Sequence, residues 1–218
     1  MADREELIQK ITRMVLENWE RLTDEPYQVP TGISARHVHL SGEHVEKLFG
    51  IGYRLKPMKA LSQPGQFSCE EQVDVCGPGG TISRVRILGP EREKSQVEVA
   101  ASDCRVLGLQ PPVRASGDLK GTPGAVLKGP KGEVVLTEGV IIADRHIHMT
   151  PEDAAWFGVS HKERVRVSVE GLKGGVFTGV LIRVSDTGRL DFHVDTDDAN
   201  AFGLSQGQWV TVRKEDAG

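Results

Sequence analysis

The spacing of hydrophobic positions changes once along the chain, near residue 30. Residues 4–21, REELIQKITRMVLENWER, carry apolar side chains every three or four positions. This spacing places those side chains on one face of an amphipathic helix. The next segment, TDEPYQVPTG, contains two prolines and interrupts the pattern. We therefore predict an N-terminal helix within residues 1–23, which either packs on the protein's own core or docks on another protein.

Beyond residue 30 the apolar residues alternate with polar ones or form short β-branched runs. Examples are TISRVRIL, EVVLTEGVIIA, ERVRVSVEG and VFTGVLIRVS, and most runs are separated by Gly, Pro or Asp. Such runs are typical of strands joined by turns. Only two short helices are predicted here, SGEHVEKLF and TPEDAAWF, the second with Thr150 as N-cap and Pro151 as its first residue. The pattern predicts a mostly β fold with short capping helices.

Two parts of the chain resemble each other. ISARHVHLSGEHVEKLFG aligns with IADRHIHMTPEDAAWFG at an offset of 146 − 37 = 109 residues. VRILGPEREKSQVEVAASDCRVLGL aligns without gaps with VLIRVSDTGRLDFHVDTDDANAFGL at an offset of 203 − 108 = 95, which places Glu98 on His193. Self-similarity of this kind indicates repeated structural units. We predict an internal duplication with one unit over residues 24–143 and a second over 144–218.

The aligned motifs carry side chains that can bind a metal ion. In a strand, residues i and i+2 face the same side, so each His-x-His motif presents two imidazoles together. Glu98 and His193 each lie between two apolar residues and therefore face away from the apolar side of their strands. Three protein ligands with an open fourth position are typical of catalytic zinc, although iron, manganese, cobalt or nickel would accept the same donors. The predicted sets are His37, His39 and Glu98, and His146, His148 and His193.

Composition excludes several classes of protein. The 218 residues include 27 basic and 31 acidic side chains, a net charge of −4, with no basic stripe typical of nucleic-acid binding. No apolar run reaches the roughly 18 residues of a membrane span. The three cysteines form no CxxC pair, which favours a reducing compartment, and the acidic start MADREEL does not resemble a secretory signal. We expect a soluble cytoplasmic protein.

One competing metal motif must be considered. His37-His39-Glu43 and His146-His148-Glu152 match the HxHx₃E opening of the cupin metal motif. Both glutamates, however, fall in the first turn of a predicted helix, where acidic side chains complement the helix dipole. The glycine and proline spacing of cupins is also missing. A cupin-like metal-binding module therefore stays as an alternative interpretation.

Five separated motifs carry a resemblance to a known family. SARHVHLS, LSQPGQF, ILGPEREKSQVEVAASD, PPVRASGDLKGTPG and ADRHIHMT together resemble the PduL-type phosphate propanoyltransferases, the phosphotransacylases of bacterial microcompartments. The resemblance runs from about residue 25 to the C-terminus. It implies two β-barrels, with residues 25–35 packed on the second, and two zinc ions held by the six residues named above. It also implies interconversion of acetyl- or propanoyl-CoA and phosphate with acyl phosphate and CoA.

The resemblance further implies substrate contacts and partners. Arg92, in GPEREKSQ, is expected to bind phosphate, which suits the fork of a guanidinium group. The N-terminal helix resembles an encapsulation peptide, so we expect partners among shell or cargo proteins inside a microcompartment, and a homo-oligomer. Nucleic acid and membrane are not expected partners. The predicted CoA contacts are Ser34, Ala35, Arg36, Arg86, Ser116 and Asn200.

Two other interpretations stay open. A different metal-dependent acyl transferase or hydrolase could use the same ligands, and a non-catalytic metal- or CoA-binding module could hold them without turnover. Activity with phosphate and acyl-CoA separates these possibilities.

Overall fold

The computed structural model describes residues 8, 12 and 27–214, and the predicted helix over residues 4–21 falls outside the continuous part of that range. Within the described chain, ten strands precede the second His-x-His motif. They are β1 (Tyr27–Ser34), β2 (His37–His39), β3 (Pro57–Ala60), β4 (Phe67–Cys76), β5 (Thr81–Gly89), β6 (Gln96–Glu98), β7 (Val113–Arg114), β8 (Ala125–Lys128), β9 (Glu133–Leu136) and β10 (Val140–Ala143). Five more follow: β11 (His146–Met149), β12 (Arg164–Val169), β13 (Gly175–Val184), β14 (Asp191–Asp195) and β15 (Trp209–Lys214).

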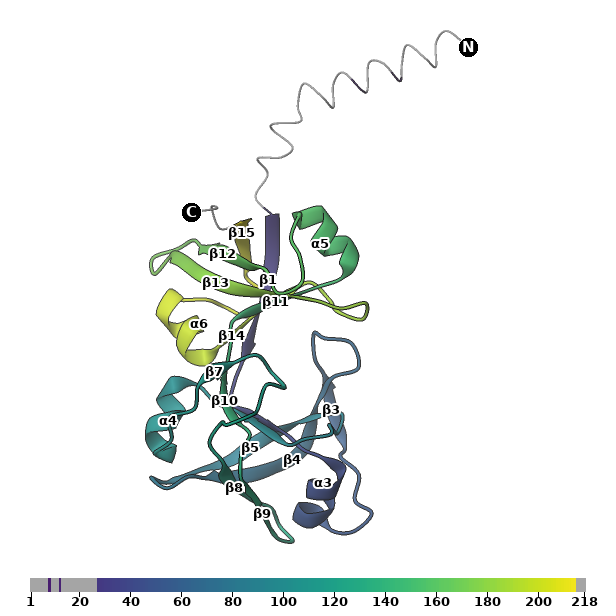
Figure 1. Ribbon diagram of the computed structural model, residues 1–218, viewed down its shortest axis with the longest axis vertical. Helices are drawn as coiled ribbons and strands as arrows, with labels where there is room; N and C mark the ends of the chain where they lie inside the picture. Colours follow the sequence, from purple (N-terminus) through teal and green to yellow (C-terminus); the bar gives the residue numbers. More distant parts are fainter. Residues whose placement is uncertain (1–7, 9–11, 13–26, 215–218) are drawn as a thin grey trace.

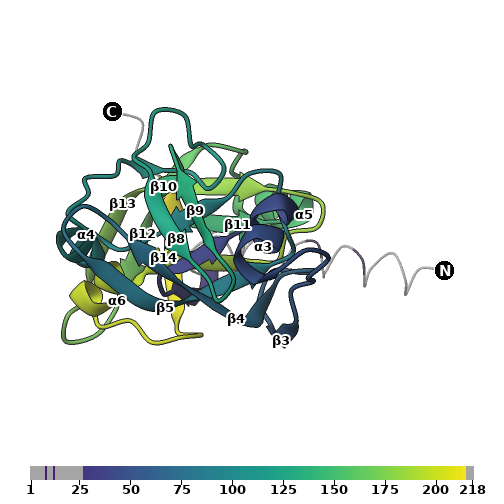
Figure 2. The same cartoon turned by 90° about the horizontal axis from the view of Figure 1, so that it is seen from below.

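The strands form one closed barrel and one open sheet. The barrel has the order β1-β14-β11-β13-β12-β15 and makes up the upper part of the molecule in Figure 1. The nine-stranded sheet has the order β7-β10-β6-β2-β5-β4-β8-β9, with β3 paired to β4, and lies below the barrel. Figure 2 shows this sheet from below, with β8 and β9 in front. The mostly β fold is confirmed.

The prediction of two closed barrels is wrong for the first unit. In the described structure β8 pairs with β4 and β9, while β10 pairs with β6 and β7. Short neighbouring strands thus occupy the two edges that would have to meet for closure. The N-terminal strand β1 lies in the other sheet, parallel to β14 and antiparallel to β15. The first unit is therefore an open, curved sheet.

Five consecutive strand pairings nevertheless match between the two sheets. The order β10-β6-β2-β5-β4-β8 has the same sequence of parallel and antiparallel pairs as β1-β14-β11-β13-β12-β15. The register also agrees, because His37 lies opposite Glu98 and His146 lies opposite His193. The third member of each predicted ligand set therefore lies across from its first histidine on the neighbouring strand.

Apolar burial fixes which way the histidines face. Val38 and Ile147, the residues between the paired histidines, are fully buried in the cores of the sheet and the barrel. Phe192 and Val194, which flank His193, are buried in the barrel core as well. Burying one side chain of this size stabilises the folded protein by about 1.5–3 kcal/mol. Because side chains alternate along a strand, this burial turns the imidazoles to the opposite face.

Four short helices lie in the described chain: α3 (Gly42–Phe49), α4 (Ala101–Leu107), α5 (Pro151–Phe157) and α6 (Thr196–Phe202). Each follows a strand that carries predicted metal ligands. The start of α5 is confirmed, because the Thr150 side chain accepts a hydrogen bond from Asp153 N and Pro151 is the first helical residue. The prediction of only two helices is wrong. Helix α4 lacks a side-chain cap at Ala100, and α6 follows β14 without a break, with Asp195 both the last residue of the strand and the N-cap of the helix.

Candidate metal and substrate site

The first predicted ligand set forms one buried cluster. His37 and His39 lie on β2, and Glu98 lies across on β6. The His37 Nε2 atom is 3.5 Å from Glu98 Oε2, and His39 Nε2 is 3.9 Å from Glu98 Oε1. All three residues are buried, and their candidate ligand atoms lie within 4.8 Å of one another. The cluster has the spacing required to surround a single ion.

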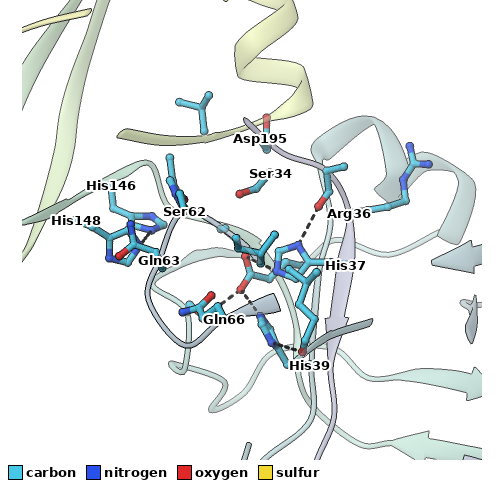
Figure 3. Close-up of a pocket in the computed structure, with 18 of the residues that line it drawn as sticks. Ser34, Arg36, His37, His39, Ser62, Gln63, Gln66, His146, His148 and Asp195 are labelled. Atoms are coloured by element: carbon cyan, nitrogen blue, oxygen red, sulfur yellow. Dashed lines mark hydrogen bonds and ion pairs between the residues drawn. The ribbon is translucent and has the colours of Figure 1, made fainter. Parts of the chain in front are cut away.

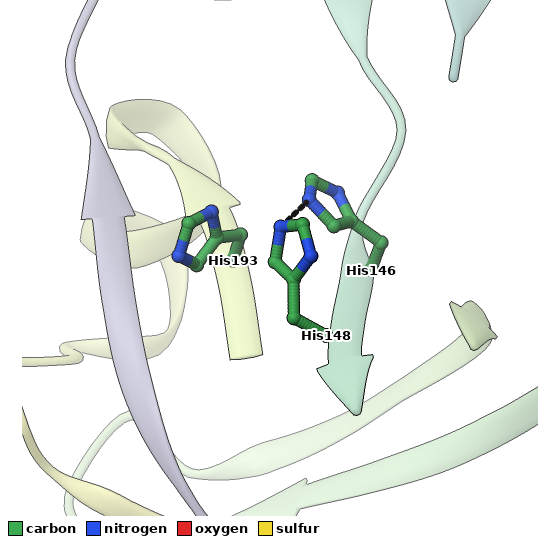
Figure 4. A group of neighbouring side chains, drawn as sticks. All are labelled: His146, His148 and His193. Carbon is green, nitrogen blue, oxygen red and sulfur yellow. Dashed lines mark hydrogen bonds between the residues drawn. The ribbon is translucent and has the colours of Figure 1, made fainter. Parts of the chain in front are cut away.

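The second predicted set forms a similar cluster in the barrel. His146 and His148 lie on β11, and His193 lies on β14 opposite His146. The Nε2 atoms of His146 and His148 are 3.0 Å apart, and the three candidate ligand atoms lie within 4.8 Å (Figure 4). Two nitrogens bound tetrahedrally at 2.0–2.1 Å from one zinc ion would lie about 3.3 Å apart. The observed separation fits that geometry.

Backbone carbonyls hold three of the histidines in the same way. A neutral imidazole that donates from Nδ1 keeps its Nε2 lone pair for a metal. The Nδ1 atom contacts a backbone oxygen in His37 (Ala35 O, 2.9 Å), His39 (Leu88 O, 3.1 Å) and His146 (Asp144 O, 2.7 Å). These contacts point the Nε2 atoms into the clusters before any ion binds.

The electrostatics of the clusters favour a bound cation. Burial, together with neighbouring histidines, lowers the pKa of His39 to about 3, that of His148 to about 2 and that of His146 to about 4. These imidazoles are therefore neutral near pH 7, the form that binds metals. Burial opposes charge on both His37 and Glu98, but their mutual attraction raises the His37 pKa and lowers that of Glu98 below its usual range. Positive charge is thus stabilised between them. Nitrogen and carboxylate donors without thiolate suit zinc and several other divalent metals.

Both clusters line a single pocket between the open sheet and the barrel. Figure 3 shows His37 and His39 on one side and His146 and His148 on the other. The loop over residues 61–66 belongs to the first unit and contacts the second. In this loop Ser62 Oγ lies 3.4 Å from His193 Nε2, and Gln63 Nε2 donates to Arg189 O at 2.9 Å. One substrate in the pocket could therefore contact both clusters.

Arg92 lies beside the first cluster. Its backbone N donates to Leu40 O at 2.9 Å, which anchors the residue at the end of β2. Its Nη1 atom donates to Ser116 Oγ at 3.1 Å, and Ser116 Oγ donates to Glu98 Oε1 at 3.0 Å. The guanidinium group predicted to bind phosphate is therefore connected to a candidate metal ligand through one hydroxyl group, and both line the pocket.

A third arginine of the pocket, besides Arg36 and Arg92, was not predicted. Arg183 lies on β13 in register with His148 and lines the same pocket. Burial lowers the pKa of both Arg183 and Arg92, and the charge of Arg183 lowers that of Arg92 further. Such groups keep their protons and make the pocket attractive to anions. The available signal was its place between Ile182 and Val184, a polar residue facing away from the barrel core.

The predicted CoA contacts fall into two groups. Ser34, Ala35, Arg36 and Ser116 line the pocket, although Arg36 also pairs with Asp103 at 2.7 Å. Arg86 and Asn200 are not among the lining residues. The Arg86 side chain donates to backbone oxygens of the neighbouring strand β4, and Asn200 is exposed on α6. The structure therefore brings four of the six residues together.

The cupin arrangement does not fit this geometry. Glu43 is exposed on α3 and pairs with Lys47 at 2.6 Å. Glu152 is exposed on α5. Neither lies in a ligand cluster, where Glu98 takes the third place in the first set. Among the described helices, none has the length and apolar character needed to cross a bilayer.

Comparisons with known proteins agree on one family. The family model described as phosphate propanoyltransferase matches residues 30–205. A phosphate propanoyltransferase of Thermotoga maritima is 51% identical over 203 residues, which cover 93% of this chain and 96% of that protein. The protein of the same name from Shewanella putrefaciens is 49% identical over 94% of this chain and 95% of its own length. A phosphate propanoyltransferase of Salmonella typhimurium is 48% identical over 91% of this chain and 92% of its own length.

Proposed function

The chain belongs to the phosphate propanoyltransferase family, and from this premise we propose that it transfers an acyl group between coenzyme A and phosphate with one zinc ion in each cluster. Membership in the family makes it an acyl-CoA:phosphate acyltransferase. The observation that carries the two-metal proposal is that two three-ligand clusters face one pocket that also contains Arg92.

In the proposed reaction an oxygen of phosphate attacks the carbonyl carbon of the acyl-CoA thioester. A carbon–oxygen bond forms and the carbon–sulfur bond breaks, so the products are acyl phosphate and the thiolate of coenzyme A, which then takes up a proton. The reverse reaction regenerates acyl-CoA. We propose acetyl- or propanoyl-CoA as the acyl donor.

The arginines bind and orient the phosphate in this proposal. Arg92 already donates to Ser116 and has further N–H donors that can form a two-pronged contact with phosphate oxygens. Arg183 lies on β13 of the barrel and lines the same pocket, so both guanidinium groups can contact one phosphate. Both groups are partly buried, and a partly buried positive charge gains more from an anionic ligand than an exposed one does.

The proposed zinc ligands are the six clustered residues. A zinc ion would supply Lewis-acid polarisation of an oxygen atom and stabilisation of a thiolate. The protein's own contribution is to keep His39, His146 and His148 neutral. It also orients the rings of His37, His39 and His146 through backbone contacts. The ligands are thereby arranged before an ion or substrate arrives, which avoids reorganisation on binding.

Coenzyme A is proposed to enter along Ser34, Ala35 and Arg36 at the pocket and to extend outward toward Arg86 and Asn200. The proposed path of coenzyme A is supported by Ala35 and Arg36, which line the pocket and are also exposed to solvent.

Residues 1–23 are proposed to direct the enzyme to a microcompartment by binding a shell or cargo protein.

The test combines metal analysis with an acyl-transfer assay. The purified full chain should contain about two zinc equivalents and should release thiol from acetyl- or propanoyl-CoA only when phosphate is present. His193→Ala should remove about one zinc equivalent. Thiol release that does not depend on phosphate would instead indicate a hydrolase. A metal-loaded protein without turnover on either substrate would indicate a binding module.

A further inference from the structure

His193 is held differently from the other histidines of the clusters. His37, His39 and His146 each contact a backbone oxygen through Nδ1. In His193 it is the Nε2 atom that has partners: Asp191 Oδ2 lies 2.9 Å away, and Ser62 Oγ is more distant at 3.4 Å. Figure 4 shows one ring nitrogen of His193 on the side of His146 and His148 and the other on the side of the N-terminal strand β1.

Asp191 is placed to make this contact by the alternation of β14. It lies two residues before His193, so both side chains face the same side of the strand, and it is opposite His148 on β11. Asp191 is only 4% exposed. A buried carboxylate requires hydrogen-bond or charge partners, and the His193 ring supplies one. The contact is therefore a built feature of the barrel rather than a surface encounter.

Gly32 leaves the space that the pair occupies. Gly32 lies on β1 in register with His193. A Cβ atom at position 32 would lie 2.6 Å from His193 Cδ2, 2.8 Å from His193 Nε2 and 3.0 Å from Asp191 Oδ2. These distances are too short for non-bonded atoms, so any larger residue would displace the ring or the carboxylate. Close approach of the backbone is the reason for glycine here.

The first cluster has a different partner at the corresponding position. Gln96 lies opposite His39, as Asp191 lies opposite His148. The Gln96 amide donates to Glu98, a carboxylate that is itself a candidate ligand. Each cluster thus contains one buried carboxylate. In the first cluster the carboxylate of Glu98 is itself a candidate ligand, and in the second the carboxylate of Asp191 contacts the candidate ligand His193.

We propose that Asp191 is a positioning residue of the second metal site. Its carboxylate accepts a hydrogen bond from His193 Nε2–H, which fixes the ring and leaves the Nδ1 lone pair directed toward His146 and His148. It also supplies the negative charge that a set of three neutral histidines lacks. A carboxylate behind a metal-binding histidine sets the tautomer and raises ligand basicity in this way. The inference rests on the metal site of the proposed function.

The test measures zinc affinity without substrate. The full chain with His37→Ala, which weakens the first cluster, is titrated with zinc against a chromophoric chelator. Asp191→Ala should raise the Kd of the second site about 10–100-fold. Asp191→Asn should raise it less, because the amide oxygen still accepts from Nε2–H. Gly32→Ala should also raise it. Asp186→Ala, which removes an exposed carboxylate on the turn before β14, should leave the Kd unchanged.

Cobalt(II) substitution separates positioning from direct ligation. If Asp191 only positions His193, the visible absorption of the cobalt-loaded Asp191→Asn variant should keep the band pattern of the parent. A change of coordination number in that spectrum would make Asp191 a ligand and overturn the proposal. A Kd within threefold of the parent in Asp191→Ala, or in Asp191→Asn and Gly32→Ala if the alanine variant does not fold, overturns it too. So does a second cluster that binds no zinc.

The outcome is independent of turnover. Zinc affinity that falls as expected in a protein that transfers no acyl group would support the role of Asp191 and refute the proposed reaction. If the Asp191 variants bind zinc as tightly as the parent and the protein shows full phosphate-dependent turnover, the role of Asp191 is refuted and the proposed reaction is supported. Thermal melting of the metal-free variants shows that each is folded before its Kd is compared.

Discussion

Replacing Arg92 should weaken the use of phosphate far more than the use of acyl-CoA. In the structure its Nη1 atom is held by Ser116, and the group lies beside the Glu98 carboxylate in the pocket. The Arg92→Ala variant would lose a two-pronged contact with phosphate. A hydrogen bond between charged groups contributes about 1.5–3 kcal/mol. Loss of two such bonds would weaken the interaction with phosphate by about 3–6 kcal/mol if nothing else changed.

The lower end of this range is the better expectation. Arg92 is only partly buried, so water can replace some of the lost contacts. Arg183 also remains in the pocket and still attracts the anion. A loss of about 3 kcal/mol corresponds to roughly a 100-fold fall in kcat/KM for phosphate. Arg92→Lys should recover part of it, because lysine keeps the charge but not the planar fork.

The assay is the initial rate of thiol release with each substrate varied in turn. Arg189→Ala is the matched control, since it removes an arginine side chain that is exposed on the turn before β14. The control should keep wild-type kinetics for both substrates. The assigned role of Arg92 is refuted if kcat/KM for phosphate stays within threefold of wild type. It is also refuted if kcat/KM for acyl-CoA falls as far as that for phosphate.

Three further results are expected. Arg183→Met should lower kcat/KM for phosphate about tenfold in the same assay with zinc content unchanged, and an unchanged value would remove it from the phosphate site. Gln63→Ala should lower the free energy of unfolding by about 1–3 kcal/mol in urea titration, because it removes two partly buried hydrogen bonds to the backbone of Arg189; a loss below about 0.5 kcal/mol would show that these two hydrogen bonds do not stabilise the fold. Deleting residues 1–22 should leave zinc content and turnover nearly unchanged but abolish co-sedimentation with shell proteins, whereas a large fall in melting temperature would place the segment on the protein's own core.

The sequence was sufficient to predict the two ligand clusters, for a simple physical reason. Val38 and Ile147 must be buried, and the two-residue period of a strand then turns the flanking histidines to the other face. The same rule, with the alignment of Glu98 on His193, identified the third member of each set. The structure places these residues opposite His37 and His146. Local pattern determined this part of the site.

The sequence was insufficient wherever long-range pairing decides. Strand β1 precedes the first unit in the chain but pairs with β14 and β15; Thr31 lies opposite Phe192, and Val29 lies opposite Val210. No local pattern specifies such a partner, and only the family resemblance implied that residues 25–35 pack on the second unit. Nor does any local pattern specify whether the edges of the first sheet meet. Arg183 and Asp191 were missed for a related reason. A single polar residue in a strand is common, and only the register with His148 on both neighbouring strands shows that these two reach the site.

The two candidate metal clusters and the pocket that they line are built by different parts of the fold. Each cluster is built from two neighbouring strands within one sheet, so its ligand spacing depends on local register. The pocket, in contrast, exists only where the sheet and the barrel meet, and it is lined by both. Gln63 ties the loop over residues 61–66 to the barrel, and Ser102 on α4 donates to Asp197 on α6 through both its backbone N and its hydroxyl group. These contacts fix the distance between the clusters. Because a phosphate and a thioester must meet in one place, the joint between the two units is as much a part of the proposed active site as the ligands themselves.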